Sequence, residues 1–225
     1  MGGCIKSCLI DSNIIAYWMI STNIHETVFD KLALPKNFKD IYDNRYGLSI
    51  SFIENIIKGA FKNKFDFITF EFNIFEVAKA IKDEIKTLYL FNKGVPISRW
   101  SNTYNHDKFD EEIISAIYTG YSKSQDTLFV ENRINLQTMP FSLNSKTYAE
   151  YYEFYNYILF RIPDLSTQDA LIISGGYVDH IDYFITEDKR LTEVWKSFTK
   201  EDKNIKGNPL IEIKNPGDSM FKAPK

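Results

Sequence analysis

Short apolar runs that end in polar turns predict the strands of this chain. The first run, residues 4–10, ends at Asp11 and is followed directly by an apolar segment at 14–20. A strand that leads through a polar turn into a helix is the start of a β–α unit. Two more strands are expected at 182–186 and 210–213.

Helical periodicity is clearest between residues 73 and 91. Apolar residues recur there at spacings of three and four and form one stripe along the helix: Ile74, Val77, Ala78, Ile81, Ile85 and Leu88. Further helices are expected at about 108–122, 146–159, 170–176 and 187–198, with shorter helical pieces between 26 and 64. Strands separated by helices indicate a parallel sheet with helices on both faces.

The expected fold is therefore α/β, with three layers in the order α/β/α around a central, mostly parallel sheet. A chain of 225 residues forms one domain by default, and no linker, internal repeat or low-complexity tract divides residues 1–225. The segment from about 92 to 150 combines a weaker helix with a polar, aromatic-rich connector. We expect it to be a helical elaboration of the single domain.

The charge balance limits the classes of function. The chain has 27 Lys and Arg residues against 30 Asp and Glu, which gives a formal net charge of −3. This balance excludes the overall basic surface that drives non-specific nucleic-acid binding, so such binding needs a local basic patch. No apolar run reaches about 18 residues, so we expect no membrane-spanning helix and no membrane partner. The run from Leu9 is interrupted by Asp11, so no signal peptide is visible and a cytoplasmic location is expected.

One local basic cluster lies at Lys58, Lys62 and Lys64, with Phe61 and Phe65 beside them. It allows two interpretations. The aromatic rings and lysines could stack and hold RNA, or they could form the basic side of an amphipathic helix, which is the commoner arrangement.

Four acidic residues stand where a strand ends or a helix begins: Asp11, Glu76, Asp169 and Asp188. The carboxyl ends of parallel strands form one edge of the sheet, where ligands bind, so we expect the four side chains to converge there. Carboxylates that close together raise one another's pKa unless a cation neutralises them. Hard oxygen ligands suit Mg²⁺ or Mn²⁺, and such a site activates water for attack on a phosphodiester.

Each acid also has a purely structural interpretation. The segments 73–76 and 166–169 have the spacing of a capping box, in which the acid reaches back to the start of its helix. Asp188 follows Thr186, a suitable N-cap residue. Asp11 could end its strand in an Asx turn. The combination of all four acids favours the functional interpretation.

The segments that contain these acids, 8–13, 72–77, 166–173 and 183–191, resemble the PIN-domain nucleases. The resemblance extends over about residues 4–20, 66–91 and 160–220. It implies a PIN-like fold and a metal-dependent endoribonuclease in which Asp11, Glu76, Asp169 and Asp188 bind Mg²⁺ or Mn²⁺. Asn13 and Thr186 would be supporting polar groups. This chain has Glu71 where the family often carries Ser or Thr, so either Glu71 or Glu76 is the inward-facing acid of the helix.

The resemblance also suggests partners. The substrate would be an RNA such as tRNA or mRNA, and Lys189 and Arg190, beside Asp188, are the candidates for holding its phosphates. Many members of the family are toxins, so an antitoxin protein and a second copy of the chain are expected partners. The alternatives are a catalytically degraded PIN-like module that binds RNA or protein, and a flap-type nuclease that acts on DNA.

Overall fold

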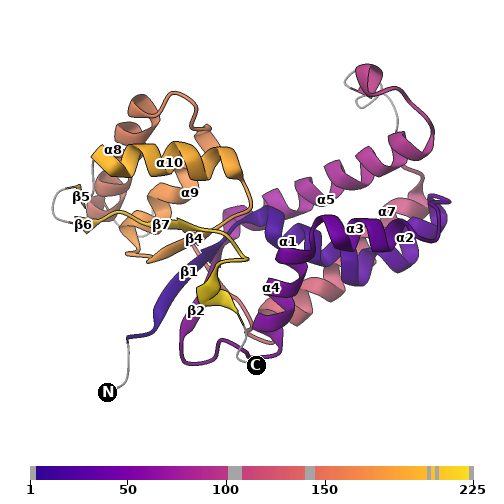
Figure 1. The fold of residues 1–225 in the computed structure, drawn as a ribbon, viewed down its shortest axis with the longest axis horizontal. Coiled ribbons are helices and arrows are strands. Elements are labelled where there is room, and N and C mark those ends of the chain that lie inside the picture. The colour runs from indigo at the N-terminus through magenta and orange to yellow at the C-terminus, as the bar shows by residue number, and fades with distance from the viewer. Residues whose placement is uncertain (1–3, 101–107, 140–144, 202–203, 206–207, 223–225) are drawn as a thin grey trace.

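The computed structural model describes residues 4–100, 108–139, 145–201, 204–205 and 208–222. Five parallel strands form its central sheet, in the order β3-β2-β1-β4-β7 (Figure 1). Their bounds are β1 Lys6–Ile10, β2 Phe65–Phe70, β3 Asn135–Gln137, β4 Tyr183–Ile185 and β7 Glu212–Lys214. Strands β5 (Asn204–Ile205) and β6 (Asn208–Pro209) form a separate antiparallel pair.

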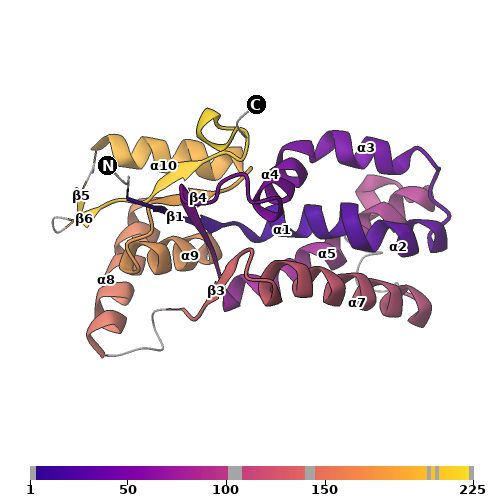
Figure 2. The same ribbon diagram turned by 90° about the horizontal axis from the view of Figure 1, so that it is seen from below.

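The helices fall into two groups, one on each side of the sheet, as Figures 1 and 2 show. The first group comprises α1 (Ser12–Met19), α2 (His25–Lys31), α3 (Phe38–Arg45), α4 (Gly47–Ile57), α5 (Glu71–Asn92) and α7 (Glu111–Gln125). The second comprises α8 (Ser145–Arg161), α9 (Thr167–Val178) and α10 (Lys189–Glu201). Short irregular helices complete the described chain: η1 (Ile20–Ile24), η2 (Ile97–Arg99), η3 (Asp126–Val130) and η5 (Ser219–Phe221).

Alternating side chains of the strands produce two cores. In β1, Cys8 and Ile10 point into the core that α1, α4, α5 and α7 share, whereas Leu9 points into the core of α8, α9 and α10. All three side chains are fully buried. A sheet that is apolar on both faces must be covered on both, which is why helices flank it. The predicted α/β fold with a parallel sheet is confirmed, and the layering is compatible with a three-layer α/β/α arrangement.

Helix α9 approaches the sheet very closely, as its small residues predict. A Cβ atom added at Gly175 would lie 3.0 Å from Cε2 of Phe70, and one added at Gly176 would lie 3.0 Å from Cδ1 of Ile211. Both distances are shorter than ordinary packing allows. This close packing holds the last turn of α9 against the side chains of Phe70 and Ile211.

Two strands of the sheet were not expected from the sequence. The segment that forms β2 contains Phe65, which was considered only as part of the basic cluster, and Phe61 lies in the core just before it, 2% exposed. An RNA-stacking patch that uses the Phe61 ring is therefore wrong. The helical elaboration expected at 92–150 contains α7 and also the edge strand β3, while its residues 101–107 and 140–144 lie outside the described chain. In the described residues no helix is both long enough and apolar enough to cross a bilayer.

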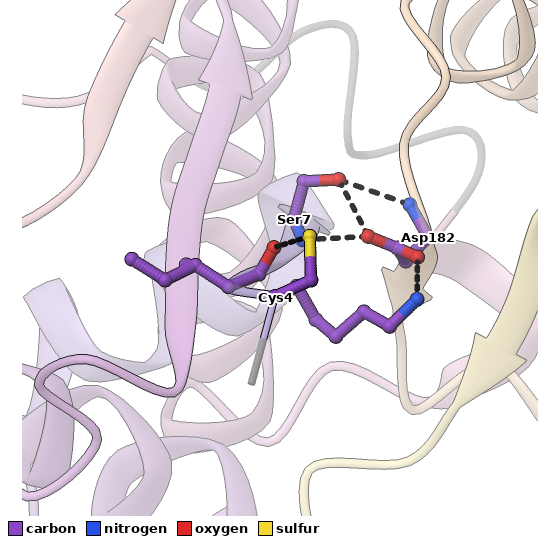
Figure 3. A network of polar contacts seen from close by, with 5 residues as sticks. Cys4, Ser7 and Asp182 are labelled. Atoms are coloured by element: carbon purple, nitrogen blue, oxygen red, sulfur yellow. Dashed lines mark hydrogen bonds and ion pairs between the residues drawn. The ribbon is translucent and has the colours of Figure 1, made fainter. Parts of the chain in front are cut away.

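Asp182 fixes the register between β1 and β4 (Figure 3). Its carboxylate accepts hydrogen bonds from the backbone N–H of Ser7 at 2.9 Å, from Ser7 Oγ at 3.1 Å and from Lys6 Nζ at 2.5 Å. Burial raises the pKa of Asp182, but the bonds from Lys6 and Ser7 outweigh it and hold the pKa below its ordinary value. The ionised carboxylate therefore stabilises the pairing of the two central strands.

Replacing Asp182 by Ala should lower the free energy of unfolding by about 1–3 kcal/mol at pH 7, because the Ser7 donors lose their acceptor. Because the pKa of Asp182 is lowered in the folded state, its ionised carboxylate stabilises the fold at pH values above the ordinary pKa of Asp. The difference in the free energy of unfolding between wild type and Asp182→Ala should therefore shrink as the pH falls below about 4. Urea denaturation at several pH values measures both effects. Asp40→Ala, at an exposed position of α3, is the control and should change stability by less than about 0.5 kcal/mol. Equal losses in the two variants would contradict the role of Asp182.

Candidate functional site

Asp11 stands between the end of β1 and the start of α1, and its residue is only 8% exposed. Its Oδ2 accepts a hydrogen bond of 2.6 Å from Thr186 Oγ1, and its Oδ1 accepts one of 3.2 Å from Ser12 Oγ. Its backbone N–H donates to the carbonyl oxygen of Ile185, the last residue of β4, at 3.0 Å. The carboxylate is therefore bound to a hydroxyl from the neighbouring strand end, and a hydrogen bond from the backbone N–H of Asn13 also lowers its pKa, in keeping with the Asx-turn interpretation.

The strand order makes this place a candidate binding site. From β1 the chain adds β2 and β3 on one side and later β4 and β7 on the other, so the order reverses between β1 and β4. In open parallel sheets, ligands bind outside the carboxyl ends of the strands at such a reversal. Asp11 and Thr186 are the residues that directly follow β1 and β4 there.

Glu76 belongs to α5, which begins at Glu71, so Asn73 is not a helix cap and the capping-box interpretation of 73–76 is wrong. Asn73 is fully buried, and its Nδ2 donates to the carbonyl oxygen of Ile10 at 3.3 Å. This bond holds the first turns of α5 against the end of β1. Glu76 lines the same cavity as Asp11, whereas Glu71 is exposed and does not line it.

Asp169 and Asp188 both lie at helix N-termini. Asp169 forms the expected capping box: its N–H donates to Ser166 Oγ at 3.0 Å, and the Ser166 hydroxyl donates to Asp169 Oδ2 at 2.6 Å. Asp188 caps α10 itself, because its Oδ1 accepts the N–H of Leu191 at 3.0 Å. The N–H of Asp188 in turn donates to Thr186 Oγ1 at 3.0 Å. The capping-box interpretation of Asp169 is thus correct, whereas Asp188, and not Thr186 as expected, is the cap of α10; both acids face the site.

A cavity of about 310 Å³ brings the four acids together. It is lined by Asp11, Glu76, Asp169, Asp188 and Asn13. These residues come from α1, α5, α9 and the segment before α10, which are far apart in the sequence. The expected convergence at the carboxyl edge of the sheet is therefore present in the structure.

The cavity also has a wall that the sequence did not reveal. Additional lining residues are Tyr17, Lys79, Asp83, Glu84 and Gln168. The lining residues of α5 recur at spacings of three and four along a face beside its apolar stripe. The same spacing is visible in the sequence among the polar residues Glu76, Lys79 and Asp83.

The pKa values of the acids reflect their closeness. Burial raises the pKa of Asp11, the bond from Thr186 works against it, and the charge of Asp169 adds to the effect of burial. Burial, followed by the charges of Asp11 and Asp169, raises the pKa of Glu76 to about 7. Burial and the charge of Asp188 raise the pKa of Asp169 despite its bonds to Ser166. The carboxylates of the cavity repel one another, as the sequence predicts.

The donor set fits a hard divalent cation in its chemistry, because carboxylate oxygens are the ligands that Mg²⁺ and Mn²⁺ prefer. In the described parts of the chain, however, no group of three or more His, Cys, Asp or Glu side chains is arranged to hold a metal ion. Hydroxyl groups now bind two of the acids, Thr186 on Asp11 and Ser166 on Asp169. These hydroxyl groups occupy one oxygen of Asp11 and one of Asp169.

The remaining residues expected in the site are Thr186, Lys189 and Arg190, of which only Thr186 contacts one of the four acids directly. Thr186 is fully buried and binds Asp11, as a supporting group should. Arg190 is exposed, donates to the carbonyl oxygen of Asp164 at 3.1 Å, and lowers the pKa of Asp169 through its charge. Lys189 is exposed as well, and neither of the two basic residues lines the cavity. Lys189 and Arg190 therefore lie near the site, as expected from the sequence, but do not line the cavity.

Comparison with known proteins gives no match of the chain to any family model, curated protein or solved structure. Arguments about function therefore depend on the residues and geometry of the cavity.

The raised pKa of Glu76 predicts a specific pH dependence of stability in the presence of a chelator. An acid with a raised pKa holds its proton more tightly in the folded state, so its ionisation lowers the free energy of unfolding as the pH rises from about 4.5 through 7. Glu76→Gln should remove this part of the decline and be more stable than wild type at pH 8 but not at pH 4.5. Chemical denaturation across this range is the measurement.

Glu71→Gln is the matched control on the same helix, since Glu71 is exposed and outside the cavity. It should follow the wild-type curve. A Glu76→Gln curve parallel to wild type at all pH values would contradict the assigned environment of Glu76.

Proposed function

We propose that the chain is a PIN-like, metal-dependent nuclease that hydrolyses phosphodiester bonds of RNA. The observation that supports this most strongly is the convergence of Asp11, Glu76, Asp169 and Asp188 on one cavity at the reversal point of a parallel sheet. The four segments that resemble the PIN-domain nucleases supply these four acids. An antitoxin partner and a second copy of the chain remain predictions of that resemblance.

Each acid has a distinct part in the proposed site. Asp11 is the anchor, because it is buried and held by Thr186 at the end of β1. Glu76 lines the cavity from α5, while Asp169 and Asp188 line it from the N-termini of α9 and α10. A bound Mg²⁺ or Mn²⁺ would supply activation of water and neutralisation of the charge that develops on the phosphate. Thr186 would orient the Asp11 carboxylate, and the four acids would hold the ion beside the phosphate of the substrate.

Asp11→Asn should reduce Mn²⁺-dependent cleavage of single-stranded RNA by about 100-fold or more, because it removes a charge from the anchoring ligand. The side chain keeps its size, so the circular dichroism spectrum should stay as in wild type. Asp40→Asn, exposed on α3, is the control for the loss of one carboxylate and should cleave at the wild-type rate. Full activity of Asp11→Asn would refute the proposed site.

The alternative function is a degraded PIN-like module that binds RNA or protein without cutting it. Metal titration separates the two functions. A ligand that binds only the folded state raises its melting temperature, so millimolar Mn²⁺ should stabilise a competent site. Wild type should show this shift and Asp11→Asn should lose most of it. The absence of any shift in wild type would favour the binding module.

A further inference from the structure

The charge of the cavity presents a difficulty for an RNA substrate. Among the described residues that line it, six carry carboxylates and a single one, Lys79, carries a positive charge. The carboxylates are those of Asp11, Glu76, Asp83, Glu84, Asp169 and Asp188. An RNA strand bears one negative charge per phosphate, and proteins contact those charges chiefly through Lys and Arg. A divalent cation bound by the four acids at the sheet edge would not offset the repulsion of the RNA phosphates by Asp83 and Glu84, which lie farther along α5.

Lys79 lies where a positive charge could bind a phosphate of the RNA strand. It follows Glu76 by three residues on α5, and such neighbours lie on one helix face with Cβ atoms about 5–6 Å apart. Its positive charge acts on Glu76, since it lowers that residue's pKa against the effect of burial. A phosphate held by Lys79 would therefore lie beside the acids that we propose to bind the ion.

The present contact of Lys79 leaves it available for a ligand. Its Nζ lies 3.7 Å from Asp83 Oδ2, and its side chain is 70% exposed. The lysine precedes the acid in the sequence, which is the weaker order for an ion pair between residues i and i+4. A long, exposed pair of this order contributes little to stability. The ammonium group can exchange Asp83 for a phosphate at small cost.

The basic residues expected for this role are placed less well. Arg190 is bonded to the carbonyl oxygen of Asp164, and neither Arg190 nor Lys189 lines the cavity. Lys79 does line it and lies between the acids at the sheet edge and those farther along α5.

We propose that Lys79 is the substrate-binding residue that holds a backbone phosphate of single-stranded RNA next to the bond that is cut. This inference depends on the proposed nuclease function. It assigns to α5 both a ligand of the ion, Glu76, and the contact to the RNA strand.

The test compares Lys79→Gln with wild type in steady-state cleavage of a single-stranded RNA oligonucleotide in Mn²⁺. KM should rise about tenfold, because one charged contact is lost, while kcat changes by less than about twofold. The slope of log(kcat/KM) against log of salt concentration should become shallower by about 0.7, the value for one phosphate contact on a single strand. Lys79→Arg, which keeps the charge, should restore the wild-type slope.

Lys82→Gln is the matched control. Lys82 is exposed on the same helix, does not line the cavity, and its substitution changes the net charge equally. Its KM and salt slope should equal those of wild type. Cleavage by wild type but not by Asp11→Asn, together with identical behaviour of Lys79→Gln and Lys82→Gln, would overturn the role of Lys79 while the nuclease function stands. No metal-dependent cleavage by wild type would instead refute the nuclease function on which the inference rests.

Discussion

The hydrogen bond from Thr186 to Asp11 is the contact on which the site depends. It places a buried carboxylate at the point where the strand order of the sheet reverses, and it joins the ends of β1 and β4. Burying an ionised carboxylate is costly unless hydrogen bonds or opposite charge compensate it. Thr186 satisfies one oxygen and Ser12 the other. Because the same Thr186 oxygen accepts the N–H of Asp188, this hydroxyl also fixes the start of α10.

Helix N-termini explain why so many acids can share one cavity. Asp11 and Asp188 stand at the N-cap positions of α1 and α10, and Asp169 lies in the first turn of α9. The partial positive charge of a helix N-terminus stabilises a nearby carboxylate. Glu76 lies in the second turn of α5, beyond the reach of most of that effect, and its pKa rises to about 7. The pKa values of Asp11 and Asp169 are raised as well, so the repulsion is shared among the acids, and a bound cation would relieve it.

The sequence predicted the parts of the fold that local pattern determines. The apolar stripe of α5, the β–α unit around Asp11 and the capping box at Ser166 are visible as spacings, and the structure contains all three. Strand β3 could not be predicted, since Asn135–Gln137 is short, largely polar and lies at the edge of the sheet. The aromatic residues of β2 directly follow the lysines of the preceding turn, so this segment resembles a continuation of the basic cluster. Strand β2 does have a local signal, because Phe65–Phe70 is rich in aromatic and β-branched residues, whereas β3 has none.

Of the candidate site, the acids could be predicted from the sequence, but the rest of the cavity wall could not. Three of its acids, Asp11, Asp169 and Asp188, could be chosen from the sequence because each follows a strand or begins a helix, and Glu76 was chosen as an acid early in the apolar stripe of α5. The cavity wall formed by Lys79, Asp83 and Glu84 could not be assigned, since it depends on which side of α5 faces α1 and α9. The distances between acids depend on the strand order, and no spacing in the sequence specifies that order. Lys189 and Arg190 lie beside Asp188 in the sequence but outside the cavity wall, because residues adjacent in sequence to a site residue need not face the same cavity.

The most direct test of the account is an anomalous-difference map from a crystal soaked in Mn²⁺. The account predicts a peak inside the cavity in contact with the Asp11 carboxylate, with Glu76 or Asp169 rotated to share the ion. A map with no peak in the cavity, or with Mn²⁺ bound elsewhere and Asp11 still held only by Thr186 and Ser12, would contradict it.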